Sequence, residues 1–270
     1  MSPLLTDMAT DSTKRFSDRV ENYVRYRPSY PPEVVDLLER EAGLSSDSVV
    51  ADIGSGTGIS AEMLLKAGFS VIGVEPNGPM REAAERLLAD YTNFKSVEGT
   101  AQETTLPDQS VDLVLAAQAF HWFAGEETRA EFSRILKPGG KVALLWNVRL
   151  VDTTPFLRDY EALLLRYGTD YNTVRHETID SKILGGFFRR MYDLHKFPNV
   201  QTFDYEGLEG RLLSSSYAPA PGHPNHASMI AELKRIFGLY QQGGMVSIDY
   251  ITEVYLGERL AEYFLRKAVS

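Results

Sequence analysis

The stretch V-V-A-D-I-G-S-G-T-G-I-S, residues 49–60, places a short apolar run directly before three glycines at alternating positions. The run 49–53 predicts a buried strand, and the apolar residues after the glycines recur at helical spacing. Gly54, Gly56 and Gly58 therefore belong to a strand-to-helix loop, in which the absence of side chains lets the backbone come close to a ligand.

This loop differs from the two phosphate-binding loops that it partly matches. A dinucleotide loop has its third glycine three positions after the second, and this chain has Ile59 there. No Lys-Ser or Lys-Thr pair follows the glycines, which argues against a Walker-type loop. The spacing thus indicates a ligand without a pyrophosphate, although the glycines alone are also compatible with a plain tight turn.

An acidic residue ends the next predicted strand. Glu75 follows F-S-V-I-G-V and lies 17 residues after Gly58. A carboxylate in this position can accept hydrogen bonds from both hydroxyls of a ribose. Together with Asp52 before the loop, Glu75 predicts a nucleoside ligand.

Apolar runs and helical patterns alternate along the first 150 residues. They predict parallel strands at 49–53, 69–74, 94–98, 111–118 and 142–147. Two later segments, 200–205 and 246–256, are expected to pair and close one edge. The predicted fold class is α/β, with a doubly wound, mostly parallel seven-stranded sheet, an antiparallel closing strand and a helical cap insertion.

We expect a single domain over residues 1–270. Its expected parts are an N-terminal arm or lid at 1–30, a cofactor-binding core at 31–149, helical cap insertions at 150–195 and 206–243, and closing strands at 196–205 and 244–260.

Composition narrows the classes of partner. The 28 Lys and Arg residues are outnumbered by 37 Asp and Glu, and the net charge of -9 disfavours nucleic acid. The absence of cysteine excludes thiolate chemistry, and His223 and His226 have no evident third ligand, so no metal site is predicted. Without a basic leader or a bilayer-spanning apolar run, we expect a cytoplasmic protein with no membrane partner. The sequence does not indicate an oligomeric state.

Three motifs point to a known family. V-A-D-I-G-S-G-T-G, G-V-E-P and V-D-L-V-L-A-A-Q resemble the successive motifs of class I S-adenosylmethionine-dependent methyltransferases, and the resemblance covers about residues 15–150. R-Y-R-P-S-Y-P, Q-A-F-H-W-F, L-L-W-N-V-R and G-R-L-L-S-S-S-Y look more narrowly like methyltransferase type 11 proteins of the trans-aconitate methyltransferase-like subgroup. This resemblance implies methyl transfer from S-adenosyl-L-methionine to a small-molecule acceptor, with S-adenosyl-L-homocysteine as product. Acceptors vary within the subgroup, so the resemblance does not identify the acceptor; we expect a carboxylate or hydroxyl oxygen.

The resemblance also implies roles for individual residues. The glycine loop would bind the methionine portion of the cofactor, and the acid at the end of the second strand would bind the ribose. Residues after the third strand would hold the adenine, and the end of the fourth strand would border the methionine tail. The implied cofactor-binding residues are Gly54, Ser55, Gly56, Thr57, Gly58, Glu75, Pro76, Ala101, Gln102 and Gln118.

Candidates for acceptor contact follow the fourth and fifth strands or precede the first helix, because ligands bind beyond the carboxyl ends of such strands. His121 is the candidate catalytic residue, as a base for an alcohol or phenol or as a contact to a carboxylate; its alternative role is to cap the following helix. The candidate substrate-binding residues are Tyr23, Tyr26, Arg27, Tyr30, Trp122, Trp146 and Asn147. The first four have a second interpretation as a packed N-terminal arm.

Two other classes of function share part of this pattern. A nicotinamide-dependent oxidoreductase would have the same sheet and ribose acid, but Ile59 and the missing pyrophosphate loop disfavour it. A noncatalytic nucleoside-binding module would keep the loop and have no enclosed acceptor pocket. A hydrolase has little support, because Ser214, Ser215 and Ser216 show no local Ser-His-acid pattern.

Overall fold

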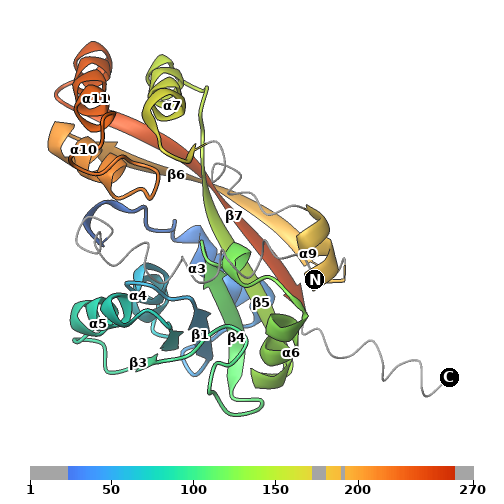
Figure 1. Ribbon diagram of the computed structural model, residues 1–270. Helices are drawn as coiled ribbons and strands as arrows, with labels where there is room; N and C mark the ends of the chain where they lie inside the picture. Colours follow the sequence, from blue (N-terminus) through green and yellow to red (C-terminus); the bar gives the residue numbers. More distant parts are fainter. Residues whose placement is uncertain (1–23, 172–180, 190–191, 259–270) are drawn as a thin grey trace.

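A seven-stranded sheet organises the computed structural model, which describes residues 24–171, 181–189 and 192–258 (Figure 1). The strand order is β3-β2-β1-β4-β5-β7-β6. Strands β1 to β5 run parallel, and β7 lies antiparallel between β5 and β6. The strands are β1 (Val49–Ile53), β2 (Ser70–Val74), β3 (Phe94–Val97), β4 (Val111–Ala117), β5 (Leu136–Arg149), β6 (Tyr192–Phe203) and β7 (Val246–Glu258). The predicted fold class is confirmed.

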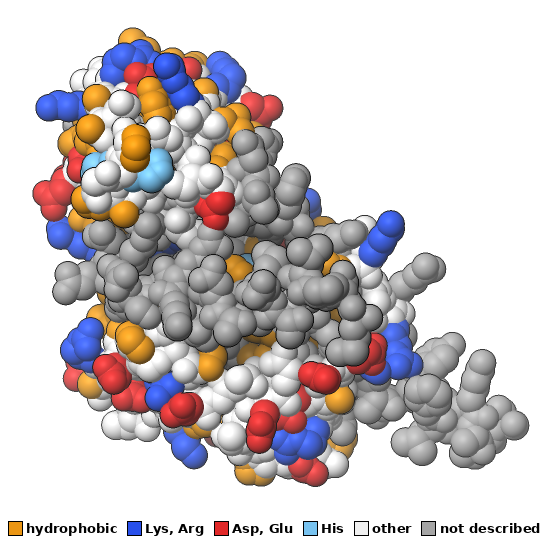
Figure 2. All heavy atoms as spheres, viewed as in Figure 1, with side chains coloured by type: hydrophobic (Ala, Val, Ile, Leu, Met, Phe, Trp, Pro, Cys, Tyr) orange, Lys and Arg blue, Asp and Glu red, His pale blue; other side chains and the backbone are white. Residues whose placement is uncertain are grey.

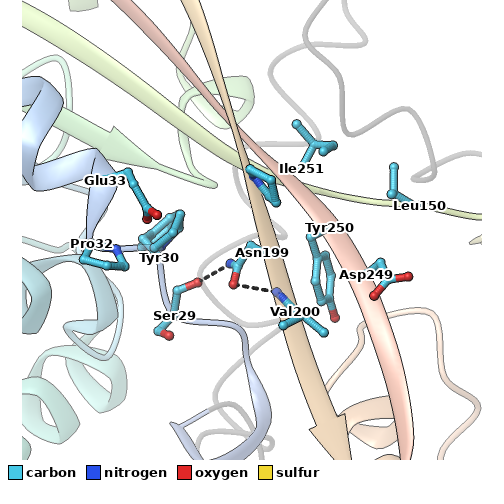
Figure 3. Close-up of a pocket in the computed structure, with 12 residues that line it drawn as sticks. Ser29, Tyr30, Pro32, Glu33, Leu150, Asn199, Val200, Asp249, Tyr250 and Ile251 are labelled. Atoms are coloured by element: carbon cyan, nitrogen blue, oxygen red, sulfur yellow. Dashed lines mark hydrogen bonds between the residues drawn. The ribbon is translucent and has the colours of Figure 1, made fainter.

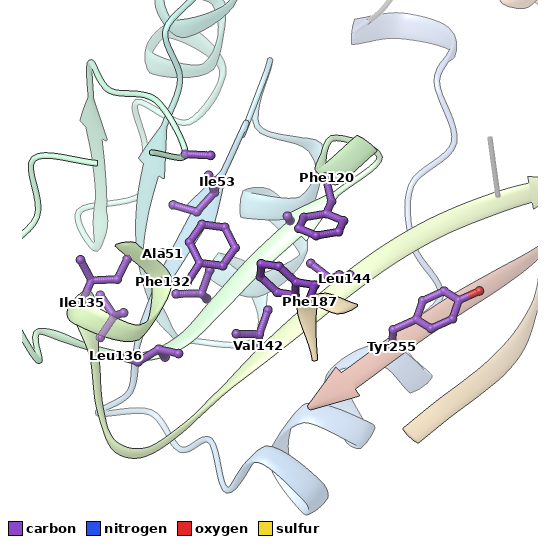
Figure 4. Packing of buried hydrophobic residues seen from close by; sticks show 14 of the residues in the cluster. Ala51, Ile53, Phe120, Phe132, Ile135, Leu136, Val142, Leu144, Phe187 and Tyr255 are labelled. Atoms are coloured by element: carbon purple, nitrogen blue, oxygen red, sulfur yellow. The ribbon is translucent and has the colours of Figure 1, made fainter. Parts of the chain in front are cut away.

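Helices cover both faces of the parallel part of the sheet. On one face, Val50 and Leu113 share a buried cluster with Leu37 and Leu64 of the covering helices. The neighbouring residues of the same strands point to the other face, where Ala51 and Val114 pack in a cluster with residues of α6 and α9 (Figure 4). The connecting helices are α3 (Glu33–Ala42), α4 (Ile59–Lys66), α5 (Gly78–Leu87), the 3₁₀ turn η2 (Phe120–Trp122) and α6 (Glu126–Ile135).

Helix α3 shows how local sequence sets these boundaries. Pro32 precedes its first residue and has a helical φ of -59°, which suits a helix start. Gly43 follows its last residue with a φ of 68°, a left-handed conformation that glycine adopts without steric cost. The helix therefore begins and ends where its proline and glycine predict.

Two strands differ from the sequence prediction. Strand β5 begins at Leu136, because the K-P-G-G segment joins the sheet through a register shift opposite Val111 and Leu113. Strand β6 begins at Tyr192, well before the predicted start at Val200. This start was not evident from the sequence, because β6 is an edge strand. An edge strand tolerates Pro198 and charged side chains, and it does not need the continuous apolar pattern that indicates a buried strand.

The far ends of β6 and β7 extend into a helical cap. Figure 1 shows α7 (Pro155–Tyr167), α10 (Tyr205–Leu213) and α11 (His226–Tyr240) gathered at this end of the molecule. Their apolar residues form a third cluster that also contains Tyr26 and Tyr250. Helix α9 (Ser181–Phe187) instead packs against the core of the sheet, where Phe187 contacts Phe132 edge-on.

The surface shows mixed charge. On the face drawn in Figure 2, Lys and Arg side chains are interspersed with Asp and Glu over both the core and the cap. Within the described ranges, no helix has the length and apolar character needed to cross a membrane.

Candidate functional site

The glycine loop connects β1 to α4, and all three of its glycines have left-handed φ angles, between 56° and 89°. A Cβ atom on Gly54 would lie 2.8 Å from Cβ of Ala119, and one on Gly58 would lie 2.7 Å from Cδ1 of Leu88. The two ends of the loop are therefore packed against the protein. Among the described residues beyond its chain neighbours, none has an atom within 4 Å of such a Cβ on Gly56, so this part of the structure leaves space at the middle of the loop.

Glu75 joins the glycine loop to the end of β2. Its Oε2 accepts a hydrogen bond from the backbone N–H of Gly56 at 2.9 Å, and its Oε1 accepts one from the N–H of Asn77 at 2.8 Å. Burial raises the pKa of the Glu75 carboxyl, against the lowering effect of these two N–H groups. The predicted ribose acid therefore lies beside the open middle of the loop.

Asp52 and Thr57 add two buried polar atoms near the loop. Asp52 is fully buried, and burial raises its pKa to about 7 even though the Ser60 hydroxyl donates to it. Asp52 Oδ1 and Thr57 Oγ1 are buried and have no hydrogen-bond partner within the described part of the chain. Such orphaned oxygens, together with the open space at Gly56, fit a polar ligand that approaches the loop.

The segment implied to hold an adenine lies beside β2. A Cβ on Gly99 would lie 3.0 Å from Cγ1 of Val74, which brings the segment after β3 close to the end of β2. Ala101 is buried, whereas Gln102 and Pro76 are exposed. The exposed Gln102 side chain is in a position to contact a ligand, and Ala101 contributes mainly to packing.

Sequence reasoning missed the residue that anchors this segment. Oε1 of Glu131, in α6, accepts hydrogen bonds from the backbone N–H of Thr104 at 2.8 Å and from its hydroxyl at 2.5 Å. Arg134 bridges Glu131 and Asp108. Burial opposes the charge of Glu131, but the hydrogen bonds from Arg134 and Thr104 outweigh it and lower its pKa to about 2. Glu131 and Arg134 lie one helical turn apart, a spacing that could have suggested the pair.

The end of β4 brings Gln118 and His121 toward the loop. Gln118 has a φ of 57°, unusual for a residue with a side chain, and its N–H donates to the carbonyl of Leu145 at 2.8 Å. His121 retains exposed surface on η2, and its ring centroid lies 4.7 Å from that of Trp122, which is half-buried. Desolvation by the surrounding protein lowers the pKa of His121 from its ordinary value of 6.5 to about 4.

Trp146 and Asn147, two of the expected substrate contacts, lie on β5 and are buried. Trp146 is 1% exposed and packs edge-on against Tyr255 in the core. Asn147 accepts a hydrogen bond from the Thr252 hydroxyl and donates to the carbonyl of Ser29 at 3.1 Å. Both side chains thus make contacts within the protein, although Trp146 Nε1 is buried without a hydrogen-bond partner among the described residues, and their role as substrate contacts stays a prediction.

The described residues of the predicted N-terminal arm that were candidate contacts, Tyr26, Arg27 and Tyr30, pack against other parts of the chain. Tyr26 lies against Gly210 of α10, where a Cβ would come within 2.1 Å of its ring. Arg27 Nη2 donates to the carbonyl of Ser214 at 3.0 Å, and Tyr30 packs in the core over β1. Expected as substrate contacts, Tyr26 and Tyr30 are almost fully buried by protein. Tyr23 lies outside the described residues.

A pocket of about 580 Å³ opens between the start of α3 and the middle of β6 and β7 (Figure 3). Tyr30 and Tyr250 line it together with two acids, Glu33 and Asp249. Tyr30 is the one predicted site residue that it contains, and no residue of the glycine loop contributes to it. We therefore do not place the candidate site in this pocket.

The two histidines with metal-like spacing make local contacts. His223 Nδ1 accepts from the N–H of Asn225 at 3.1 Å, and His226 Nδ1 lies 2.8 Å from the carbonyl oxygen of Pro219. In residues 24–171, 181–189 and 192–258, no group of three or more His, Cys, Asp or Glu is arranged to hold a metal ion.

The sheet order and the antiparallel β7 define a Rossmann-like α/β fold, in which the glycine loop faces a strand-end acid. Residues 51–144 match the family model described as a methyltransferase domain. The matched part of the chain holds the glycine loop, Glu75 and His121, and it is similar to the methyltransferase domain family.

The chain is also similar to relatives named as methyltransferases and, in fold, to solved structures. An uncharacterized methyltransferase-like protein of Schizosaccharomyces pombe is 36% identical over 158 residues, which cover 58% of this chain and 60% of the relative. The chain thus matches somewhat more than half of that relative's length. A protein from Anaeromyxobacter dehalogenans assigned as a type II methyltransferase shares the fold, with a TM-score of 0.63 at 21% identity, over 87% of this chain and 99% of the other.

A third similar structure carries a ligand. It is phospholethanolamine N-methyltransferase 2 of Haemonchus contortus, in complex with phosphomonomethylethanolamine and S-adenosylhomocysteine. The TM-score is 0.54 at 14% identity, over 93% of this chain and 59% of the other. At this identity the likeness concerns the fold alone.

Proposed function

We propose that this protein is an S-adenosylmethionine-dependent methyltransferase that acts on a small molecule, at a carboxylate or hydroxyl oxygen. The observation that carries the proposal is the hydrogen bond between Glu75 Oε2 and the N–H of Gly56, beside open space at the middle of the loop. It brings a carboxylate suited to ribose hydroxyls next to a backbone that a ligand can approach closely.

The residues present fit the proposed cofactor. Glu75 would hold the ribose, and the glycine loop with Thr57 would hold the methionine portion. Gln102 would contact the adenine. The orphaned hydroxyl of Thr57 supports this assignment, because a buried polar atom without a partner is costly unless a ligand satisfies it. When bound, the cofactor supplies an electrophilic methyl group.

The other role of the protein in the proposed reaction is to position the acceptor relative to the cofactor. A protein that holds two reactants in line can lower the barrier by roughly 7–11 kcal/mol without acid–base chemistry. The lowered pKa keeps His121 neutral at physiological pH, so its side chain is better suited to form a hydrogen bond with the acceptor than to take up a proton from it. We therefore propose His121 as a residue that orients the acceptor.

The proposal is tested by ligand binding to the full chain. Isothermal titration with S-adenosylhomocysteine, S-adenosylmethionine and NAD should show binding of the first two and none of the third. Binding of NAD alone would instead support the oxidoreductase, which Ile59 disfavours. Cofactor binding without turnover across an acceptor library would support the noncatalytic module.

A further inference from the structure

An arginine in the helix after β2 contacts the segment that carries the expected ribose acid. Arg81 lies near the start of α5. The helix begins after Asn77, whose side-chain oxygen accepts the N–H of Met80 at 3.0 Å and whose carbonyl accepts the N–H of Arg81 at 3.0 Å. Side chains of an α-helix point toward its N-terminal end. The Arg81 side chain therefore reaches back to the residues that precede the helix.

The Arg81 guanidinium group joins the ends of two strands. Its Nη1 donates to the backbone carbonyl of Glu75 at 2.9 Å, and its Nη2 donates to Oε2 of Glu98 at 3.1 Å. Glu75 follows β2 and Glu98 follows β3. The two strand ends are also joined directly, because the N–H of Glu75 donates to the carbonyl of Val97 at 3.1 Å. One side chain thus contacts both the ribose acid and the residue before the segment implied to hold the adenine.

The two contacts of Arg81 differ in what they can contribute. The side chain of Glu98 is 75% exposed, and ion pairs at the surface contribute little to stability. The side chain of Arg81 is only 19% exposed and Glu75 is buried, so the hydrogen bond between them is largely shielded from water. This second contact fixes the backbone from which the Glu75 carboxylate projects toward Gly56.

Arg81 also affects the charge of Glu75. Burial raises the pKa of the Glu75 carboxyl, whereas two backbone N–H groups and the positive charge of Arg81 lower it. Asp52 lies close enough to Glu75 for like charges on the two acids to repel each other. A hydrogen bond to an ionised carboxylate is stronger than one to a neutral acid. The charge of Arg81 therefore favours the form of Glu75 that binds hydroxyl groups more tightly.

We infer that Arg81 is a positioning residue for the cofactor, which holds Glu75 in place for the ribose hydroxyls through the hydrogen bond to its backbone carbonyl; this inference rests on the proposed function. The contacts of Arg81 in the described part of the chain are with the protein, so it acts through Glu75. Loss of Arg81 should therefore weaken the bonds between Glu75 and the ribose more than it weakens the other contacts of the cofactor.

The test measures this coupling by calorimetry on the full chain, with S-adenosylhomocysteine and with its 2′-deoxy analogue, which lacks one ribose hydroxyl. The wild type should bind the analogue about tenfold to a hundredfold more weakly, the usual effect of losing one hydrogen bond to a charged acceptor. Arg81→Met should bind S-adenosylhomocysteine about tenfold more weakly than the wild type does, and it should lose less affinity for the analogue. The ratio of the two affinities should thus be smaller in Arg81→Met than in the wild type.

Two further variants separate positioning from a general effect on the fold. Arg86→Met is the matched control, because Arg86 lies in the same helix and is exposed, and it should leave both affinities unchanged. Arg81→Lys should recover part of the affinity for S-adenosylhomocysteine, since lysine keeps the charge but lacks the planar fork that reaches two acceptors. If Arg81→Met does not fold, the ratio is measured in Arg81→Lys, where it should also lie below that of the wild type.

An unchanged ratio in a folded Arg81 variant would overturn the inference, because a loss shared equally by both ligands indicates a general change in the fold. Unchanged affinities for both ligands would overturn it as well. Two results with the wild type alone count against the proposed function, and the inference falls with it. These are the absence of S-adenosylhomocysteine binding and equal affinities for S-adenosylhomocysteine and its 2′-deoxy analogue.

Discussion

The Ser60 hydroxyl donates a 2.7 Å hydrogen bond to Oδ2 of Asp52, and this bond ties the strand before the glycine loop to the helix after it. Asp52 is fully buried, and burial raises its pKa from an ordinary value of 3.8 to about 7. The residues on either side of the glycine loop are therefore joined through a carboxyl group whose ionised form is disfavoured by burial.

Asp52 should make the stability of the protein depend on pH. Because the folded-state pKa lies above the unfolded value, its contribution is fully present below about pH 4 and is lost as the pH rises through 7. We expect the free energy of unfolding to fall over this range by as much as about 1.4 kcal/mol per pH unit. Urea unfolding of Asp52→Asn, which keeps an oxygen for Ser60, should show a flatter dependence; identical slopes would contradict this account.

Gly56→Ala should damage cofactor binding more than it damages folding. Its φ of 56° costs a side chain about 1–2 kcal/mol, but no atom of the described residues lies within 4 Å of the new methyl group. Gly43→Ala is the matched control, with a φ of 68°, open surroundings and a location at the end of α3. Both variants should lose similar stability in urea, while calorimetry should show weaker S-adenosylhomocysteine binding for Gly56→Ala alone. Equal affinities of the two variants for S-adenosylhomocysteine would show that the glycine loop is not part of the cofactor site.

Glu131→Ala should release the segment implied to hold the adenine. The change removes a charged acceptor from Thr104, and each such bond contributes about 1.5–3 kcal/mol. We expect lower stability in urea and weaker S-adenosylhomocysteine binding, whereas Glu127→Ala, at an exposed position of the same helix, should change neither. Since the pKa of Glu131 is lowered to about 2, its contribution should persist above pH 4.5 and be lost as the pH falls toward 2.

His121 should not produce a rate inflection near pH 6.5. With a pKa of about 4, its imidazole is already neutral at pH 5.5 and stays so at higher pH. Once an acceptor is identified, kcat at saturating cofactor should be independent of this group from pH 5.5 to 7.5, and His121→Asn should keep much of the rate because it can still donate a hydrogen bond. An inflection near 6.5 that disappears in His121→Ala, with a loss of about 10²–10⁴-fold, would show general-base catalysis instead.

The parallel core of this fold was predictable from the sequence because its signals are local. Buried parallel strands are continuous apolar runs, and Gly43 and Gly54 mark turns that few other residues allow. The start of β6 was not predictable, since an edge strand with one partner needs no apolar alternation.

The contact between the glycine loop and Glu75 could be expected from the sequence, because the loop and the acid each follow a predicted parallel strand. Contacts between distant segments could not be expected. Trp146 follows a predicted strand but is buried against Tyr255 of β7, a segment about a hundred residues later in the chain. Glu131 carries no motif of its own, and its role appears only when α6 packs beside Thr104.

Calorimetric titration of S-adenosylhomocysteine into the wild type and into Glu75→Ala tests the central claim most directly. Glu75 lies between the N–H groups of Gly56 and Asn77 and is the acid expected to bind the ribose. Each lost hydrogen bond to a charged acceptor is worth about 1.5–3 kcal/mol, so the affinity of a folded variant should fall about tenfold to a hundredfold. No binding to the wild type, or unchanged affinity in a folded Glu75→Ala, would contradict the account.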